Sequence, residues 1–281
     1  MSDPEVVHDF EALLDYLKRS RGFDLTGYKR ASPMRRVRRR MGVVGVEGFR
    51  DYIDYLEVHP DELAHLFNMV LINVTTFFRD PEAWEFLRTH AIPRIVAARG
   101  PHGPIRVWSA ACSSGEEAYT LAILLAEALG PDAFRERVKI YGTDVDEEAL
   151  TLARAATYPP KQVEGVPAEL LDRYFERTAS HYSFRKEFRR AIIFGRNNLV
   201  HDSPISRIDL LTCRNSLMYF NPETQARILA RFHFALNDGG YLMLGRSETL
   251  LSHPNIFVPA EIKQRIFTKV ARVNPVSGCS R

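Results

Sequence analysis

Two kinds of hydrophobic pattern divide the chain. Up to about residue 72, apolar side chains recur every three or four positions, as in Phe10, Leu13, Leu14 and Leu17. This spacing predicts three or four amphipathic helices and gives no sign of a strand. Beyond residue 73, short continuous apolar runs alternate with helical patterns, which predicts parallel strands joined by helices.

The clearest unit of this second part begins with an apolar run over residues 105–111. A turn of small residues ending at Gly115 follows it, and then a helical apolar pattern that stops at Gly130. A second apolar run, residues 138–144, ends in Asp144, about 30 residues after the first, as in a parallel βαβ unit. In such a unit, the acid that ends the second strand faces the ribose hydroxyls of a bound nucleoside.

The composition of the turn decides which nucleoside fits. A dinucleotide needs several glycines around its pyrophosphate, whereas this turn has only Gly115, and Glu116 and Glu117 would repel a diphosphate. A cofactor with a ribose and a cationic arm suits the turn better, and S-adenosylmethionine has both. An ordinary sheet turn with solvated acids is the alternative that the pattern alone leaves open.

Polar residues also adjoin other predicted elements of the second part. Residues 73–79 form a predicted loop that ends in Arg79, a guanidinium placed to hold an anion. A predicted buried strand over residues 208–213 leads directly into Arg214 and Asn215. Residues 180–197 carry short apolar pieces at 181–184 and 191–195, which predict a small antiparallel excursion from the main sheet.

A helix predicted from Ser32 carries an apolar stripe and a run of arginines. Such a run is usually a solvated helix face, and the alternative is a dock for an acidic partner. The arginines of this run are Arg35, Arg36, Arg38, Arg39 and Arg40.

Charge and cysteine usage narrow the class of protein. The net charge of +3 over 281 residues implies no bulk polyanion partner. The three cysteines, Cys112, Cys213 and Cys279, have no metal-binding spacing, which argues against a disulfide framework or a zinc site. No signal peptide or membrane span is predicted, so we expect a cytoplasmic protein. Because no metal-ligand spacing is found, we also expect no bound metal.

Six segments, which together span most of the chain, form a recognisable set. They are Tyr28-Lys29 with the arginine-rich helix, residues 73–79, residues 108–117, residues 142–146, Asn198-Leu199 and residues 213–220. Their joint occurrence, which is more specific than any one of them, resembles the chemotaxis protein methyltransferase (CheR) family, which methylates receptor glutamates with S-adenosylmethionine. Cys112, Thr212 and Ser216 depart from the family pattern.

The resemblance implies an α/β fold, a Rossmann-like S-adenosylmethionine-dependent methyltransferase sheet with an N-terminal all-helical domain and a small antiparallel β-subdomain. The implied boundaries are 1–72 for the substrate-docking helical domain and 73–281 for the methyltransferase domain, with the β insertion within about 178–197. The implied product of the cofactor is S-adenosylhomocysteine.

Site residues follow from the resemblance position by position. Arg79 and Tyr219 are the implied catalytic residues, and the arginine run becomes the implied dock for substrate. The implied cofactor-binding residues are Asn73, Thr75, Arg79, Glu117, Asp144, Asn198, Leu199, Arg214 and Asn215.

The implied activity is a protein-glutamate O-methyltransferase acting on acidic, Glu-bearing helices of chemoreceptor cytoplasmic domains. We expect a monomer that neither binds nucleic acid nor inserts into the membrane. Two alternatives remain from the sequence: a nucleic-acid methyltransferase whose arginine run contacts phosphates, and a non-catalytic cofactor-binding scaffold.

Overall fold

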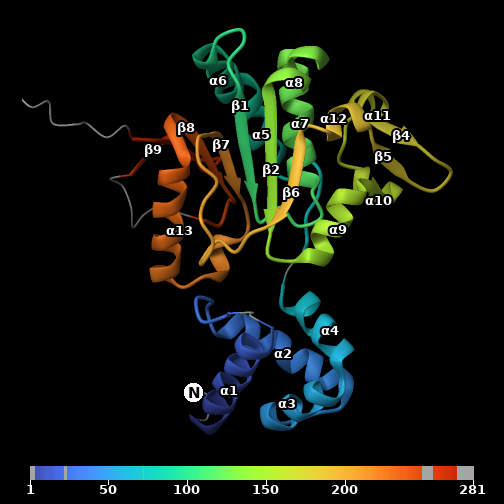
Figure 1. Ribbon diagram of the computed structural model, residues 1–281, viewed down its shortest axis with the longest axis vertical. Helices are drawn as coiled ribbons and strands as arrows, with labels where there is room; N and C mark the ends of the chain where they lie inside the picture. The colour runs from blue at the N-terminus through green and yellow to red at the C-terminus, as the bar shows by residue number, and fades with distance from the viewer. Residues whose placement is uncertain (1–3, 22–23, 72, 249–255, 271–281) are drawn as a thin grey trace, which may run out of the picture. The chain divides into compact units, whose positions relative to one another are not determined.

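The computed structural model describes residues 4–21, 24–71, 73–248 and 256–270 (Figure 1). The chain forms two compact units. Unit 1 comprises Met1–Val74 with Met218–Gln225, and unit 2 comprises Thr75–Leu217 with Ala226–Arg281. Cys279 lies outside the described residues.

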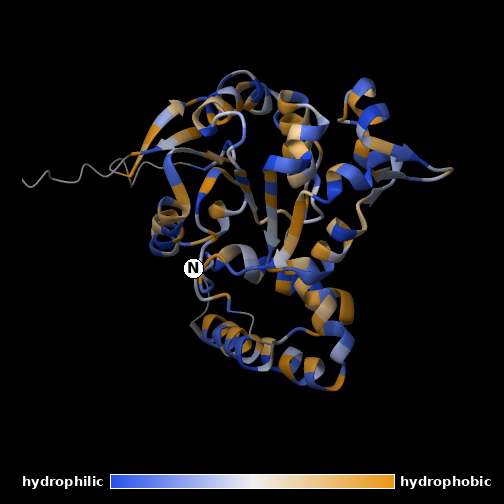
Figure 2. Ribbon diagram, turned by 45° about the horizontal axis from the view of Figure 1, so that its top comes forward, coloured by the Kyte–Doolittle hydropathy of each residue, from blue (hydrophilic) through white to orange (hydrophobic). Residues whose placement is uncertain are grey.

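Unit 1 is built from amphipathic helices, as their spacing predicts. Its core contains Leu13 and Leu17 together with the rings of Phe10 and Phe49, whose centroids are 5.2 Å apart. In Figure 2 these helices carry alternating orange and blue segments, as expected of elements with one buried face. The helices are α1 (Pro4–Arg21), α2 (Ala31–Val44), α3 (Phe49–Val58) and α4 (Pro60–Val70).

A distant segment of the chain completes unit 1. The segment from Met218 to Gln225 joins the loop after α1 through a backbone bridge between Tyr28 and Phe220. Their ring centroids are 4.5 Å apart, and the Lys29 N–H donates to the carbonyl of Tyr219 at 2.8 Å.

Unit 2 contains a sheet whose strand order, in the described residues, is β6-β2-β1-β7-β8-β10-β9 (Figure 1). Neighbouring strands from β6 to β8 run parallel, whereas β10 is antiparallel to both β8 and β9. The bounds are β1 (Ile105–Ala110), β2 (Val138–Asp144), β6 (Ile192–Arg196), β7 (Ile208–Cys213), β8 (Leu236–Leu244), β9 (Phe257–Glu261) and β10 (Ile266–Lys269).

Helices cover both faces of this sheet. Val107 of β1 belongs to one buried cluster with Leu121 of α7 (Glu116–Leu129). The next residue, Trp108, instead packs against Phe232 of α13 (Pro222–Ala235), with ring centroids 5.7 Å apart. Successive strand residues point to opposite faces, so α7 and α13 lie on opposite sides of the sheet. The parallel strands joined by helices that the alternating pattern predicts are thus confirmed, in the Rossmann-like sheet that the resemblance implies.

The remaining helices of unit 2 are short. One π-helical turn, η1 (Leu87–Ala91), joins α5 to α6, and a 3₁₀ turn, η2 (Leu217–Tyr219), crosses into unit 1. The others are α5 (Pro81–Phe86), α6 (Ile92–Arg99), α8 (Pro131–Arg137), α9 (Glu147–Ala155), α10 (Pro160–Val163), α11 (Ala168–Tyr174) and α12 (Lys186–Arg189).

A small antiparallel sheet also forms, but the prediction of its strands was partly wrong. Its order is β3-β5-β4, from Thr157–Tyr158, Tyr182–Phe184 and Phe175–Arg177. Residues 191–195 were expected in it, yet β6 pairs in parallel with β2 at the edge of the main sheet. A short apolar run does not reveal which strand it will pair with, and strands of two or three residues carry no readable period.

Within the described ranges, no helix is both long enough and apolar enough to cross a membrane.

Candidate functional site

The turn after β1 is fastened to the end of β2 by Asp144. The Asp144 carboxylate accepts hydrogen bonds from the backbone N–H groups of Ser113 at 2.8 Å and Asp146 at 3.0 Å. The carboxyl group is almost wholly buried, and this burial raises its pKa although the two N–H groups favour the charged form. A buried acceptor therefore stands at the carboxyl end of β2, beside the turn, where the sequence predicts a ribose contact.

Close packing explains why this turn ends in glycine. Gly115 has a φ of +94°, in the left-handed region. A Cβ there would lie 3.0 Å from the Cβ of Ala153 and 3.2 Å from ring atoms of Phe194 and Tyr119. A side chain at this position would therefore require its neighbours to shift by a few tenths of an ångström.

Glu117 is held by hydroxyl groups from two adjacent strands. Its Oε1 accepts from Ser109 Oγ at 2.8 Å and from Thr212 Oγ1 at 2.6 Å. Ser109 and Thr212 are register partners in β1 and β7, so both hydroxyls face the first turn of α7. The guanidinium of Arg214 lies 3.7 Å from the other carboxylate oxygen. A buried carboxylate is therefore kept in one orientation at the carboxyl edge of the sheet.

Arg214 connects this carboxylate to the loop that contains Arg79. Arg214 Nη2 donates to the carbonyl of Arg79 at 2.8 Å and to Asp80 Oδ2 at 2.5 Å. The indole of Trp84 also donates to the Arg79 carbonyl, at 2.7 Å, and its ring lies 5.1 Å from the Arg214 guanidinium carbon. Thr75 lies at the start of the same loop, whose Phe77 is buried against unit 2 aromatics.

The other unit 2 residues implied by the resemblance lie in loops after strands. Asn198 and Leu199 follow β6, and the Asn198 side chain accepts from the Val200 N–H at 2.9 Å. Asn215 follows β7 with a φ of +59°, and its N–H donates to the buried carboxylate of Glu248 at 3.1 Å. Polar groups of this unit thus gather after β2, β6 and β7, at one edge of the parallel sheet.

Two of the implied site residues belong to unit 1. Asn73 is exposed and lies near the end of the first of the two chain segments that form unit 1. Tyr219 lies in the segment that bridges to Tyr28, and the guanidinium carbon of Arg36 lies 5.7 Å from the centroid of its ring.

The arginines of α2 separate into two groups. Arg40 forms a bidentate ion pair with buried Glu62, at 2.6 and 2.5 Å, and Arg36 donates to the carbonyl of Val70 at 2.8 Å. Arg35, Arg38 and Arg39 are exposed. These three side chains remain accessible on α2, whereas Arg40 is committed to its own unit.

Sequence reasoning missed several residues that build this site. Asp80, Trp84 and Glu248 hold the loops of Arg79 and Asn215 through partly buried hydrogen bonds. Thr212 was noted only as a departure from the family pattern, although its position at a strand end beside Ser109 is where a hydroxyl can reach Glu117. No spacing rule in the sequence singles out the other three.

Two buried polar atoms test whether a cofactor fits here. Ser113 Oγ and Arg214 Nε are buried with no hydrogen-bond partner within the part of the chain that the structure describes. A hydroxyl and a guanidinium N–H beside Asp144 and Glu117 suit a nucleoside carrying a charged amino-acid arm. The residues present therefore fit S-adenosylmethionine.

Two family models match almost the whole chain. The model described as CheR methyltransferase, all-alpha domain, matches residues 8–71, and the model described as CheR methyltransferase, SAM binding domain, matches residues 73–266. The chain belongs to the CheR methyltransferase family. The resemblance, the fold class and the cofactor S-adenosylmethionine are thereby confirmed, and the protein is an S-adenosylmethionine-dependent methyltransferase.

Relatives of this CheR protein differ in length. It is 32% identical to the chemotaxis protein methyltransferase of Listeria innocua, over 89% of this chain and 93% of the relative. It is 34% identical to that of Salmonella typhimurium, over 85% of this chain and 83% of the relative. An uncharacterized 104.1 kDa protein of Rhodobacter capsulatus is 38% identical over 91% of this chain, which spans only 27% of that relative.

Proposed function

We propose that this protein transfers methyl groups from S-adenosylmethionine to glutamate side chains of a chemoreceptor or related signalling protein in sensory adaptation. The observation that carries the proposal is the pair of buried carboxylates, Asp144 and Glu117, each oriented by two hydrogen-bond donors at one edge of the sheet. The names of the Listeria and Salmonella relatives, chemotaxis protein methyltransferases, support the class of substrate.

The cofactor supplies, when bound, a methyl group on a positively charged sulfur. Asp144 would accept hydrogen bonds from the ribose, and Glu117 would pair with the amino-acid arm. Asn198 and Leu199 would adjoin the adenine, while Arg214 and Asn215 would lie along the cofactor. Asn73, Thr75 and Arg79 would complete the set around the reaction centre.

The acceptor chemistry needs positioning more than proton transfer. A glutamate carboxylate has an unperturbed pKa of about 4.3, so it is already an anion at neutral pH and needs no general base. Alignment of the reacting groups can contribute roughly 7 to 11 kcal/mol of the barrier reduction. We assign to Arg79 the positioning of this carboxylate, because a guanidinium orients an anion and cannot act as a base. Tyr219 is the second proposed catalytic residue, orienting the acceptor oxygen.

The substrate would be an acidic helix that docks on α2. Arg35, Arg38 and Arg39 are exposed on this helix, and a helix face bearing glutamates complements them in charge. Arg36 and Arg40 would act indirectly, because each makes a hydrogen bond inside unit 1.

Incubation of the full chain with labelled S-adenosylmethionine and receptor cytoplasmic domains tests the proposal. Glutamate methyl esters release labelled methanol in alkali, whereas methylated RNA or DNA does not. Arg79→Ala should abolish transfer, and Arg88→Ala, a change at an exposed surface ion pair, should leave it intact. Alkali-stable label on nucleic acid, or unchanged transfer by Arg79→Ala, would contradict the proposal.

A further inference from the structure

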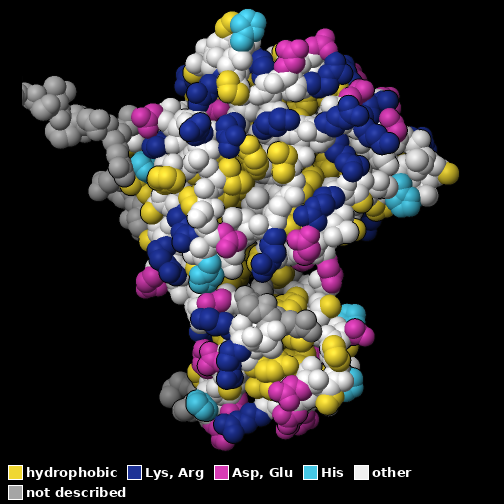
Figure 3. All heavy atoms as spheres, viewed as in Figure 1, with side chains coloured by type: hydrophobic (Ala, Val, Ile, Leu, Met, Phe, Trp, Pro, Cys, Tyr) yellow, Lys and Arg dark blue, Asp and Glu magenta, His cyan; other side chains and the backbone are white. Residues whose placement is uncertain are grey.

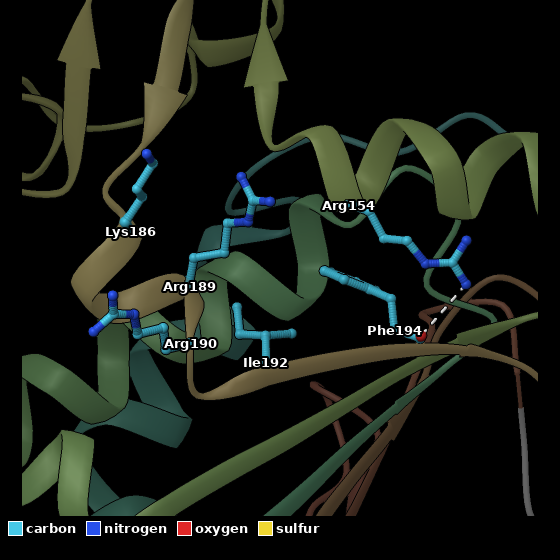
Figure 4. A pocket seen from close by; sticks show the side chains of 6 residues that line it. All are labelled: Arg154, Lys186, Arg189, Arg190, Ile192 and Phe194. Carbon is cyan, nitrogen blue, oxygen red and sulfur yellow. Dashed lines mark hydrogen bonds between the residues drawn. The ribbon is translucent and has the colours of Figure 1, made fainter.

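A basic pocket lies at the side of unit 2, between two helices and the edge strand β6. Its volume is about 480 Å³. Figure 4 shows Arg189 and Ile192 at its middle, with Lys186 and Arg190 on one side and Phe194 with Arg154 on the other. Neither Asp144 nor Glu117 lines it, so it is separate from the site described above.

The pocket is lined by four cations and no acid. Arg154 pairs with Glu147 at 2.5 Å, outside the lining. Within the described ranges, Lys186, Arg189 and Arg190 have no carboxylate at ion-pair distance, and the guanidinium of Arg189 donates only to the carbonyl of Ala155 at 3.4 Å. Figure 3 shows several Lys and Arg side chains gathered in the region where Figure 1 places α12.

This arrangement contrasts with the rest of unit 2. Several of its other arginines meet a carboxylate: Arg88, Arg99, Arg135, Arg173 and Arg214 each form an ion pair. Neighbouring like charges repel unless an anion lies between them. The cations of the pocket therefore form a concentrated positive site that a multiply charged anion would neutralise.

The opposite wall of the pocket is apolar and fixed in place. The Phe194 ring lies within 2.6 Å of the position that a Cβ on Gly142 would occupy, and within 3.2 Å of that on Gly115. The ring thus fills the space that two glycines leave, and Ile192, only 9% exposed, is packed beside it on the same strand. An apolar surface held this way is pre-formed for a ligand.

We propose that this pocket binds a nucleoside polyphosphate. Its volume falls in the range of small-ligand sites, and arginine forks match phosphate oxygens in pairs. The cations of α12 and α9 suit a compact anion of several charges better than a single carboxylate. The apolar wall of Ile192 and Phe194 suits the nucleoside part. The proposal stands apart from the methyl-transfer function.

Calorimetric titration of the full chain with ATP in EDTA tests this site. S-adenosylhomocysteine is kept at saturation, so that the nucleotide cannot occupy the cofactor site. We expect one ATP bound per chain, and binding weakened at least tenfold in Lys186→Gln/Arg190→Gln. Both of these side chains are exposed, so the variant should fold normally. Inorganic triphosphate should bind at least threefold more weakly than ATP, because it lacks the nucleoside.

A matched control removes the same charge elsewhere. Arg88→Gln/Arg135→Gln, at two exposed ion pairs of unit 2, should bind ATP within twofold of the unchanged protein. Equal weakening in both double variants, or absence of ATP binding while S-adenosylhomocysteine is saturating, overturns the proposal. So does tighter binding of phosphatidylglycerol vesicles or oligoribonucleotides than of ATP through Lys186 and Arg190.

Discussion

The Arg214 side chain hydrogen-bonds to the backbone of Arg79, although the two residues lie far apart in the sequence. The Nη2 group of Arg214 donates to the Arg79 carbonyl at 2.8 Å, across 135 positions, and the same nitrogen reaches Asp80 at 2.5 Å. Trp84 donates to the same carbonyl at 2.7 Å. The end of β7 and helix α5 therefore fix together the place from which the Arg79 side chain extends.

Trp84→Phe should slow methyl transfer without abolishing cofactor binding. The substitution keeps an aromatic ring beside Arg214 and removes the indole donor to the Arg79 carbonyl. A shift of Arg79 by a fraction of an ångström should lower kcat by roughly tenfold or more, while the affinity for S-adenosylmethionine changes less than twofold. Steady-state kinetics and calorimetry measure the two quantities.

The control for Trp84→Phe is Trp108→Phe. This change also removes a hydrogen bond donated by an indole, to Thr143 Oγ1 at 2.9 Å, but that bond does not involve the Arg79 loop. If both variants lose kcat equally, the loss reflects general destabilisation and the positioning role of Trp84 is wrong.

Glu117→Gln should weaken cofactor binding more than it weakens the fold. The amide oxygen can still accept from Ser109 and Thr212, so the local bonds survive while the negative charge beside Arg214 is lost. We expect the affinity for S-adenosylmethionine to fall about tenfold to a hundredfold, measured by calorimetry. Thr212→Val, which removes one donor and keeps the charge, should reduce the affinity by a smaller factor. A larger loss of affinity in Thr212→Val than in Glu117→Gln would show that the charge of Glu117 is not what binds the cofactor.

Gly115→Ala should distort the turn through contact as well as through backbone strain. Its φ of +94° is unfavourable for alanine, and the new Cβ would meet Ala153, Phe194 and Tyr119 at 3.0–3.2 Å. Gly45 lies in the same left-handed region, with a φ of +75° and a ψ of +26°, and nothing lies within 4 Å of its Cβ position. Gly45→Ala thus measures the strain alone, about 1–3 kcal/mol in urea unfolding.

Gly115→Ala should therefore cost more free energy of unfolding than Gly45→Ala, and it alone should weaken cofactor binding. Equal losses in the two variants would mean that the neighbours of Gly115 yield, and that contact with Phe194 and Tyr119 does not constrain the turn.

The sequence predicted the elements whose signals are local. The helices of unit 1, the strand–turn–helix after Ile105 and the position of Asp144 at the end of β2 follow from apolar period and turn chemistry. Asp146 shows the same kind of local signal: an aspartate directly before a helical pattern is typical of a cap, and its side chain accepts from two N–H groups of α9.

What the sequence did not predict depends on pairing between distant segments. Ser109 and Thr212 become register partners only when β7 joins β1, and only then do both hydroxyls face Glu117. In the same way, β6 extends the main sheet because it pairs with β2, which its apolar run could not reveal. The division of the α2 arginines likewise needed the position of Glu62 on α4.

Glu62 should make the stability of unit 1 depend on acid pH. Burial alone would raise the pKa of Glu62, but hydrogen bonds from Arg40 and Tyr52 lower it below its usual value. A carboxyl group whose pKa is lowered on folding stabilises fully above its unfolded pKa of about 4.3, and this stabilisation is lost as pH falls through its folded pKa. Protection of the α2–α4 amides should therefore fall steeply below about pH 4.

Hydrogen exchange measures this protection in unit 1 directly. Tryptophan fluorescence would report on unit 2 instead, because both tryptophans, Trp84 and Trp108, belong to that unit. Glu62→Gln should flatten the pH dependence, whereas Glu47→Gln, at an exposed position, should not. An unchanged profile in Glu62→Gln would show that other carboxyl groups govern the acid response.

Removing the exposed charges of α2 should weaken recognition of the protein substrate and leave the cofactor site untouched. Arg35 and Arg39 lie one helical turn apart on the same face, and no carboxylate pairs with either within the residues that the structure describes. Arg35→Gln/Arg39→Gln should raise KM for a receptor cytoplasmic domain roughly tenfold, with a weaker dependence on salt, because fewer charges attract the acidic helix. The affinity for S-adenosylmethionine should stay within twofold.

Arg88→Gln/Arg135→Gln, which removes two charges from unit 2, should leave KM unchanged, since net charge alone does not select the substrate. An equal rise in KM for both double variants would mean that general electrostatic attraction, and not docking on α2, brings the substrate to the protein.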